Sequence, residues 1–141
     1  MQWGRVAAGK GTKYLPEYHA STPDTVWPYY GLSAEDAKLV TLARGARGRI
    51  GAAEGAAVRD ETGRSYTGAT AVLGTLTLSA VQVAVVQAHT SGARGLEAVV
   101  VVRRDADLPT ADLDAVRALG GEGVAVLVMA PDGAPLARLR S

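Results

Sequence analysis

The chain of 141 residues contains no cysteine and no phenylalanine, and it has only two histidines, His19 and His89. Without cysteine it forms no disulfide and offers no thiolate for catalysis or metal binding, which is typical of a cytoplasmic protein. The two histidines lie far apart in the sequence, and no helical spacing places them on one face. We therefore expect no metal site and no bound cofactor.

Long apolar runs and an excess of charge are absent as well. No apolar run reaches about 18 residues, so we expect no membrane-spanning helix and no membrane partner. The first residues, Met1 to Arg5, lack the apolar block of a signal peptide, so export is not expected. The formal net charge is +1, which gives no electrostatic reason to expect a nucleic-acid partner.

The composition that remains is that of a globular domain, with 48% apolar and 21% charged residues. Its aromatic residues are unevenly placed, because all but one lie before residue 31. These are Trp3, Tyr14, Tyr18, Trp27, Tyr29 and Tyr30. Residues 1–31 have no helical or strand periodicity, so we interpret them as an irregular arm and residues 32–141 as the domain. The arm is either a disordered leader or an anchor that packs on the domain, a sister subunit or another protein.

From residue 32 onward, hydrophobic periodicity and turn signals predict alternating helices and strands. Ser33 is expected to cap a helix that ends between Gly45 and Gly48. A hairpin is predicted over residues 56–70, with Gly63 in its turn. The other predicted elements are a buried strand over 96–102, a helix over 109–120, a buried strand over 124–129 and a short last segment over 135–139.

The stretch from Leu76 to Ser91 is ambiguous. Its valines favour a strand, whereas its length, a capping Thr77 or Ser79 and a terminating Gly92 favour a helix. We predict a helix. Such a helix would be apolar on nearly every side, so it must be buried within the domain or at a subunit contact.

Three features together resemble the cytidine deaminase family over about residues 33–141. They are the sequence Gly55-Ala56-Ala57-Val58, the pattern Gly63-x-x-Tyr66-Thr67-Gly68 and the apolar helix that follows. The resemblance implies an α/β fold, a three-layer α-β-α sandwich with a mixed sheet of about five strands. It also implies a homo-oligomer, a dimer or a tetramer, because members of the family associate through helices near the active site.

The sequence departs from the family where the family's metal chemistry resides. The zinc-binding His or Cys and the proton-carrying Glu of the family are replaced by Ser79 and Val81, and the two Cys of Pro-Cys-x-x-Cys are replaced by Thr110 and Leu113. A catalytic zinc is normally held by three thiolate, imidazole or carboxylate ligands. Hydroxyl and hydrocarbon groups do not replace them, so we predict that the chain does not catalyse zinc-dependent deamination.

The Asn and Glu with which the family holds the ribose are replaced as well, by Thr70 and Val72. A vestigial pocket would then have a lining of hydroxyl and hydrocarbon groups, which suits an apolar or weakly polar ligand better than a nucleoside. Its six expected residues are Thr70, Val72, Ser79, Val81, Thr110 and Leu113.

A group of aspartates follows the predicted strand over 96–102, at Asp105, Asp107, Asp112 and Asp114. Their spacing lacks the glycine and the terminal Glu of a calcium-binding loop. We therefore expect them to form a solvated loop and helix start rather than a cation site.

Two classes of function remain. In the first, which we favour, the chain is a non-catalytic deaminase-like protein that acts by forming a homo-oligomer or by binding a protein partner through its arm. In the second, the vestigial pocket binds a small molecule or catalyses a metal-free reaction on a substrate other than a nucleoside.

Overall fold

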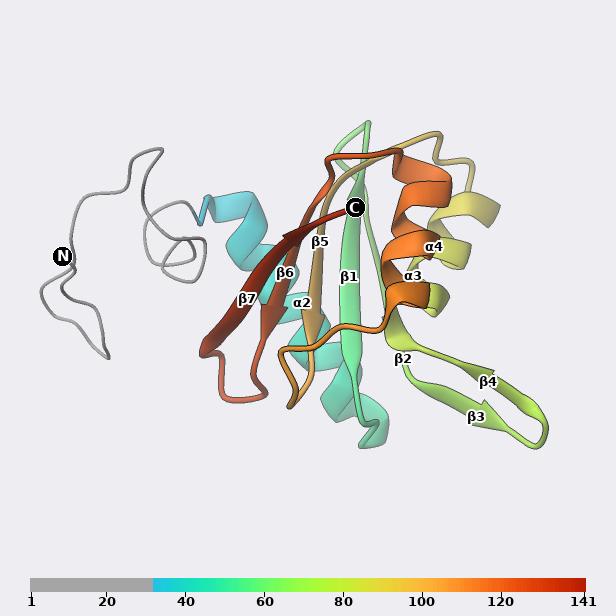
Figure 1. Ribbon diagram of the computed structural model, residues 1–141, viewed down its shortest axis with the longest axis vertical. Helices are drawn as coiled ribbons and strands as arrows, with labels where there is room; N and C mark the ends of the chain where they lie inside the picture. Colours follow the sequence, from blue (N-terminus) through green and yellow to red (C-terminus); the bar gives the residue numbers. More distant parts are fainter. Residues whose placement is uncertain (1–31) are drawn as a thin grey trace, which may run out of the picture.

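The computed structural model describes residues 32–141, so the predicted arm and its six aromatic side chains lie outside the described residues. Helices and strands alternate along the described chain (Figure 1). The helices are α2 (Ala34–Ile50), α3 (Ala80–Thr90) and α4 (Thr110–Gly120). The strands are β1 (Gly55–Asp60), β2 (Ser65–Ala69), β3 (Ala71–Leu73), β4 (Leu76–Leu78), β5 (Leu96–Val102), β6 (Ala125–Met129) and β7 (Pro135–Arg140).

Five strands form a mixed sheet in the order β2-β1-β5-β6-β7. Strands β5 and β6 are parallel and are joined through α4, whereas the other neighbouring pairs are antiparallel. Helix α2 covers one face of the sheet, and α3 and α4 lie on the other (Figure 1). The predicted three-layer sandwich with a five-stranded mixed sheet is therefore confirmed.

The sheet separates two apolar cores. Successive side chains of a strand point to opposite faces, so β5 contributes to both cores. Its Val99 and Val101 pack beneath α3 and α4, whereas Val100 and Val102 pack beneath α2. Burial on both faces is what the uninterrupted apolar run of this strand predicts.

The predicted hairpin and the elements of the C-terminal half are confirmed. Strands β1 and β2 pair antiparallel, with Ala57 opposite Thr67. Helix α4 begins at Thr110 and ends at Gly120, with Val116 fully buried. Strands β6 and β7 differ from the predicted segments by one residue at an end, which is within the usual uncertainty of element boundaries.

Helix α2 is longer than predicted. Its N-cap is confirmed, because the Ser33 hydroxyl accepts a hydrogen bond from the backbone N–H of Asp36 at 3.0 Å. The predicted end between Gly45 and Gly48 is wrong, because the helix continues to Ile50 and ends at Gly51 in the left-handed conformation. Burial of Ala43 and Ala46 against the sheet stabilises the helix beyond the point where glycine propensity would end it.

The predicted helix over residues 76–91 is wrong in its first three residues. Leu76–Leu78 form β4, which pairs antiparallel with β3 in a separate two-stranded sheet, with Leu73 opposite Leu76. The alternating Leu-Thr-Leu sequence has the period of a strand, and the helix begins only after Ser79 caps it. Figure 1 shows this ribbon extending away from the layered body of the domain.

Close packing of α3 on the sheet depends on Gly68 in β2. A Cβ atom at this position would lie 2.6 Å from the carbonyl oxygen of Ala80 and 2.9 Å from Cβ of Val83. Any larger residue would therefore push α3 away from the sheet. Gly68 thus fixes the distance between the sheet and the N-terminal end of α3, where the candidate site lies.

The described residues contain no helix of the length and apolar character needed to cross a membrane.

Candidate functional site

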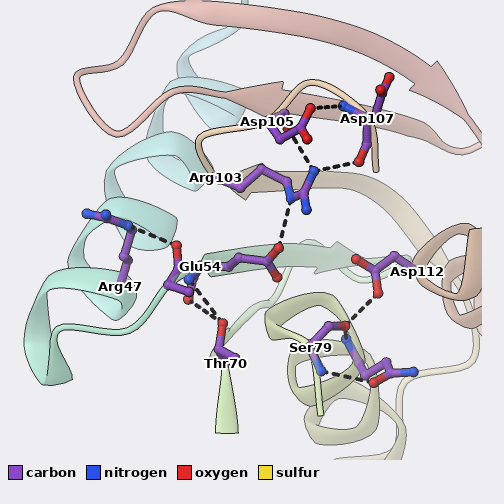
Figure 2. Close-up of polar contacts among 10 residues, drawn as sticks. Arg47, Glu54, Thr70, Ser79, Arg103, Asp105, Asp107 and Asp112 are labelled. Carbon is purple, nitrogen blue, oxygen red and sulfur yellow. Dashed lines mark hydrogen bonds and ion pairs between the residues drawn. The ribbon is translucent and has the colours of Figure 1, made fainter. Parts of the chain in front are cut away.

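The N-termini of α3 and α4 are joined by a hydrogen bond between two side chains. The Ser79 hydroxyl donates to Oδ1 of Asp112 at 2.6 Å (Figure 2). The same hydroxyl caps α3 by accepting from the backbone N–H of Gln82 at 3.1 Å, and the Gln82 side chain accepts from the backbone N–H of Ser79 at 2.9 Å. This reciprocal capping box fixes the position of the hydroxyl at the start of α3.

Asp112 is a buried carboxyl group, with 2% of its surface exposed. The expectation that it lies in a solvated helix start is therefore wrong, whereas Asp105, Asp107 and Asp114 are exposed as expected. Its position four residues before the buried Val116 places it on the inner face of α4. That helical spacing is the sequence signal that would have predicted its burial.

The two oxygens of Asp112 have different surroundings. Oδ1 accepts the Ser79 hydroxyl, whereas Oδ2 is buried without a hydrogen-bond partner among the described residues. Burial raises the pKa of Asp112, and the nearby charge of Glu54 raises it further. The hydrogen bond from Ser79 and the charge of Arg103 act in the opposite direction but do not outweigh burial.

An ion pair between Arg103 and Glu54 lies beside Asp112 (Figure 2). Nε of Arg103 is 2.8 Å from Oε2 of Glu54, and its Nη1 donates to the backbone carbonyls of Asp105 and Asp107 at 2.8 and 2.6 Å. Glu54 precedes β1 and Arg103 follows β5, so the antiparallel pairing of these strands places them side by side. This ion pair was not predicted from the sequence, because it depends on the pairing of β1 with β5.

Of the two residues at the family's ribose-binding positions, the structure places only Thr70 in this network. Its hydroxyl accepts from the backbone N–H of Glu54 at 3.0 Å, and its own N–H donates to the carbonyl of Glu54 at 3.1 Å. Val72 lies in β3 of the projecting ribbon, where 67% of its surface is exposed.

The remaining three expected pocket residues belong to α3 and α4. Val81 is fully buried in the core beneath these helices, and Leu113 packs against the same core. Thr110 is the first residue of α4 and is exposed. The structure therefore brings Ser79 to the start of α4 and packs Val81 and Leu113 in the same apolar core. Thr110 and Val72 lie at the surface.

Two open hollows lie near the ends of α2 and β5, and one of them includes both residues of the Arg103–Glu54 ion pair. One of about 440 Å³ is lined by Arg47, residues 51–54 and residues 103–105. Another of about 400 Å³ is lined in part by Arg44 and Arg47 of α2 and by Val102 at the end of β5. None of the six expected pocket residues lines either hollow.

The described residues group no three side chains of His, Cys, Asp or Glu closely enough to hold a metal ion. His89 is exposed in the last turn of α3, at the opposite end of this helix from Ser79. Within this part of the chain, the Ser79–Asp112 pair therefore has no imidazole beside it that would accept a proton from the hydroxyl.

Comparison with known proteins agrees with this architecture. A family model described as "Cytidine deaminase-like" matches residues 32–133. The fold is similar to that of a crystal structure of cytidine deaminase from Burkholderia pseudomallei. The sequence identity is 20%, the TM-score is 0.63, and the match covers 74% of this chain and 90% of that chain. For the enzyme from Mycobacterium tuberculosis the identity is 24%, the TM-score is 0.57 and the coverage is 74% and 91%. No curated protein sequence matches the chain.

At these identities the structural likeness bears on the fold alone, whereas the family model covers most of the chain. The match spans α2, the hairpin and the two helices whose N-termini meet at Ser79 and Asp112. This chain belongs to the cytidine deaminase-like family.

Proposed function

We propose that the chain is a non-catalytic member of its family that acts by association with another protein chain. The hydrogen bond between Ser79 and Asp112 carries the non-catalytic part of this proposal. It joins the two helix N-termini at which the family resemblance implies zinc. A hydroxyl and a carboxyl group thus connect α3 and α4 directly at this place.

The residues at this place do not fit zinc. Of the three ligand positions implied by the resemblance, Ser79 and Thr110 offer hydroxyls that stay protonated near neutral pH, and Leu113 offers no donor atom. Asp112 supplies a single carboxylate, whereas a catalytic zinc normally has three protein ligands.

The position of the family's proton-carrying Glu also argues against deamination. Val81 is fully buried in the core and packs in the same cluster as Leu113. A valine side chain neither accepts nor donates a proton, and its burial leaves no room for a substrate beside it. The apolar side chains of Val81 and Leu113 instead stabilise the contact between α3 and α4 as part of the core.

The alternative, a vestigial pocket reused for a small molecule, has less support. Val81 and Leu113 of the expected lining are core residues, and Val72 is on the projecting ribbon. The two hollows described above lie instead near the ends of α2 and β5, and their charged lining residues are Arg44, Arg47, Glu54, Arg103, Arg104 and Asp105. They offer no reactive group at the start of α3.

Zinc content and cytidine turnover test the proposal. The full chain is produced with added zinc, desalted, and analysed for bound metal and for ammonia release from cytidine. The matched comparison is a variant that restores the family's side chains, S79C/V81E/T110C/L113C. We expect the native chain to retain far less than about one zinc ion per chain. The restored variant should retain more, because it supplies three thiolates.

Stoichiometric zinc in the native chain, or metal-dependent release of ammonia from cytidine, would contradict the proposal. A restored variant that fails to fold is recognised by its circular dichroism spectrum. In that case the native chain alone decides the question, because its zinc content and activity are measured directly.

A further inference from the structure

The two hollows near the ends of α2 and β5 concentrate positive charge. Of the six charged side chains in their linings, four are arginines, which are Arg44, Arg47, Arg103 and Arg104. The other two are the carboxylates of Glu54 and Asp105. The linings therefore have an excess of two positive charges. This local excess is larger than the formal net charge of the whole chain, which is +1.

The fold explains why these arginines are neighbours. Arg44 and Arg47 are three residues apart on α2, so their side chains are adjacent on one face of the helix. Strand β5 ends at Val102, and Arg103 and Arg104 follow it directly. Because α2 packs on β5, both pairs of arginines reach the same part of the surface. Arg47 lines both hollows and therefore lies at their common border.

Both hollows lie outside the carboxyl ends of the parallel strands β5 and β6. One is lined by Val102, the last residue of β5, and by Pro131, the second residue after β6. The other is lined by residues 103–105, which follow β5. In open α/β sheets, ligands bind in the crevice outside the carboxyl ends of the strands. The position in the sheet therefore indicates a ligand site independently of the charge.

The arginines of the linings differ in their partners. Arg103 pairs with a carboxylate, whereas Arg44, Arg47 and Arg104 form no ion pair within residues 32–141. Arg47 is half-buried, and its Nε donates to the backbone carbonyl of Ala53 at 3.2 Å (Figure 2). This bond holds the guanidinium in place. Its two terminal nitrogens have no hydrogen-bond partner in this part of the chain, so they are available to a ligand.

The charge and the donor geometry indicate the class of ligand. A guanidinium group forms paired hydrogen bonds with phosphate oxygens, and a phosphate monoester carries about −1.5 to −2 charges at pH 7. That charge matches the excess of two positive charges in the linings. We propose that the two hollows form a binding site for a phosphate group, either free phosphate or a phosphate ester. Arg47 is its central residue, with Arg44 from one hollow and Arg104 from the other.

This inference goes beyond the proposed function, because it assigns a small anionic ligand to a different surface. None of the four positions at which the family's metal chemistry resides lines the hollows; these are Ser79, Val81, Thr110 and Leu113. Volumes of about 400 and 440 Å³ are within the range of small-molecule pockets. Binding of a phosphate group by arginines requires neither a metal ion nor a reactive side chain.

Isothermal titration calorimetry of the full chain tests the proposal. The probes are inorganic phosphate and glucose 6-phosphate at pH 7, with the ionic strength held constant, and the reference titrations are sodium chloride and glucose. The variant R44Q/R104Q removes two exposed lining arginines. The control is R49Q, because Arg49 is also an exposed arginine of α2 but lines neither hollow. Circular dichroism compares the folds of all variants.

We expect a dissociation constant below about 1 mM for at least one phosphate probe with the native chain. In R44Q/R104Q it should rise by at least about tenfold, because charge-assisted hydrogen bonds are lost, whereas R49Q should change it less than about twofold. Binding of inorganic phosphate assigns the site to free phosphate, and binding of glucose 6-phosphate alone assigns it to a phosphate ester. The single variants R44Q and R104Q should each have an intermediate effect, so they replace a double variant that does not fold.

Absence of binding by both probes up to about 10 mM would overturn the proposal. The same holds for heat that sodium chloride or glucose reproduces, or for a loss of affinity in R49Q equal to that in R44Q/R104Q. None of these outcomes depends on zinc content or cytidine turnover. Failure here is therefore distinct from failure of the non-catalytic assignment.

Discussion

Two carboxyl groups, Asp60 and Asp112, are buried to the same extent, with 2% of each residue exposed, yet their surroundings are opposite. Asp60 ends β1 and accepts four hydrogen bonds: from Thr62 N–H at 2.8 Å, from its hydroxyl at 2.7 Å, from Arg64 N–H at 3.0 Å and from the Tyr66 hydroxyl at 2.8 Å. Asp112 accepts one, from a hydroxyl that also serves as a helix cap.

The difference appears in the pKa values. Burial would raise the pKa of Asp60, but the hydrogen bonds from Thr62, Tyr66 and Arg64 outweigh burial and lower it from 3.8 to about 2. For Asp112, burial and the charge of Glu54 outweigh the bond from Ser79, and the pKa is raised. The turn thus favours the ionised form of Asp60, whereas the junction of α3 and α4 disfavours the ionised form of Asp112.

The largest expected effect is that of D60N at the hairpin turn. An amide cannot accept all the donors that converge on Asp60, so we expect a loss of about 2–3 kcal/mol in the free energy of unfolding at pH 7. The folded pKa lies below the unfolded value, so this stabilisation is present above pH 4 and is lost as the pH falls towards about 2. Denaturant unfolding at several pH values measures both the loss of stability at pH 7 and its dependence on pH.

The control for this prediction is D132N. Asp132 accepts a single backbone bond, from Ala134 at 2.9 Å, in the exposed turn between β6 and β7. Its substitution should change stability by no more than about 0.5 kcal/mol. Equal losses in D60N and D132N would show that the donors around Asp60 contribute little.

A smaller loss is expected for S79A at the junction of α3 and α4. The variant removes a helix cap, worth about 1 kcal/mol, and leaves Asp112 without its hydrogen-bond donor. The matched variant S33A removes only a cap, because the Ser33 hydroxyl bonds only the backbone of Asp36. Thermal unfolding of both should show the greater loss for S79A. A loss no greater than that of S33A would indicate that the bond to Asp112 adds no stability.

The smallest effect, and of opposite sign to D60N, is expected for D112N. An amide keeps an acceptor for Ser79 and removes a buried charge that has one unpaired oxygen, so stability at pH 7 should stay level or rise by less than about 1 kcal/mol. Because the folded pKa is raised, any gain should shrink as the pH falls towards 3.8 and the native carboxyl becomes protonated in both states.

D114N serves as the control on the same helix, because Asp114 is exposed and pairs only with Arg117. It should leave stability within about 0.5 kcal/mol of the native value at every pH. A clear loss of stability in D112N at pH 7 would remove the contrast between the two buried carboxyl groups.

The sequence predicted those parts of the fold whose signal is local. The hairpin turn at Gly63, the continuous apolar run of β5 and the cap at Ser33 each depend on neighbouring residues, and each prediction is confirmed. The cap at Ser79 is confirmed, whereas the end of α2 and the assignment of Leu76–Leu78 to a helix were wrong, because contacts distant in sequence decide them. Burial of Ala46 extends α2, and pairing with β3 removes Leu76 from the helix.

For the candidate site, too, some features were predicted from the sequence and others were not. The resemblance to the family identified Ser79, Thr110 and Leu113 as positions without its zinc ligands and Val81 as the position without its proton carrier. It did not predict that Asp112 bonds to Ser79, nor that Val72 lies on a projecting ribbon. Both facts depend on how α3, α4 and the ribbon are placed by the sheet.

The sequence by itself determined which chemical groups this protein has: no thiolate, two imidazoles and hydrocarbon at the position of the family's proton carrier. It also determined the alternation of helices and strands, because side-chain periodicity is a local property. Only the tertiary structure decided that Asp112 is buried against Ser79 and that the apolar ribbon of β3 and β4 extends from the domain. The reason is that burial and pairing depend on contacts between segments far apart in the chain.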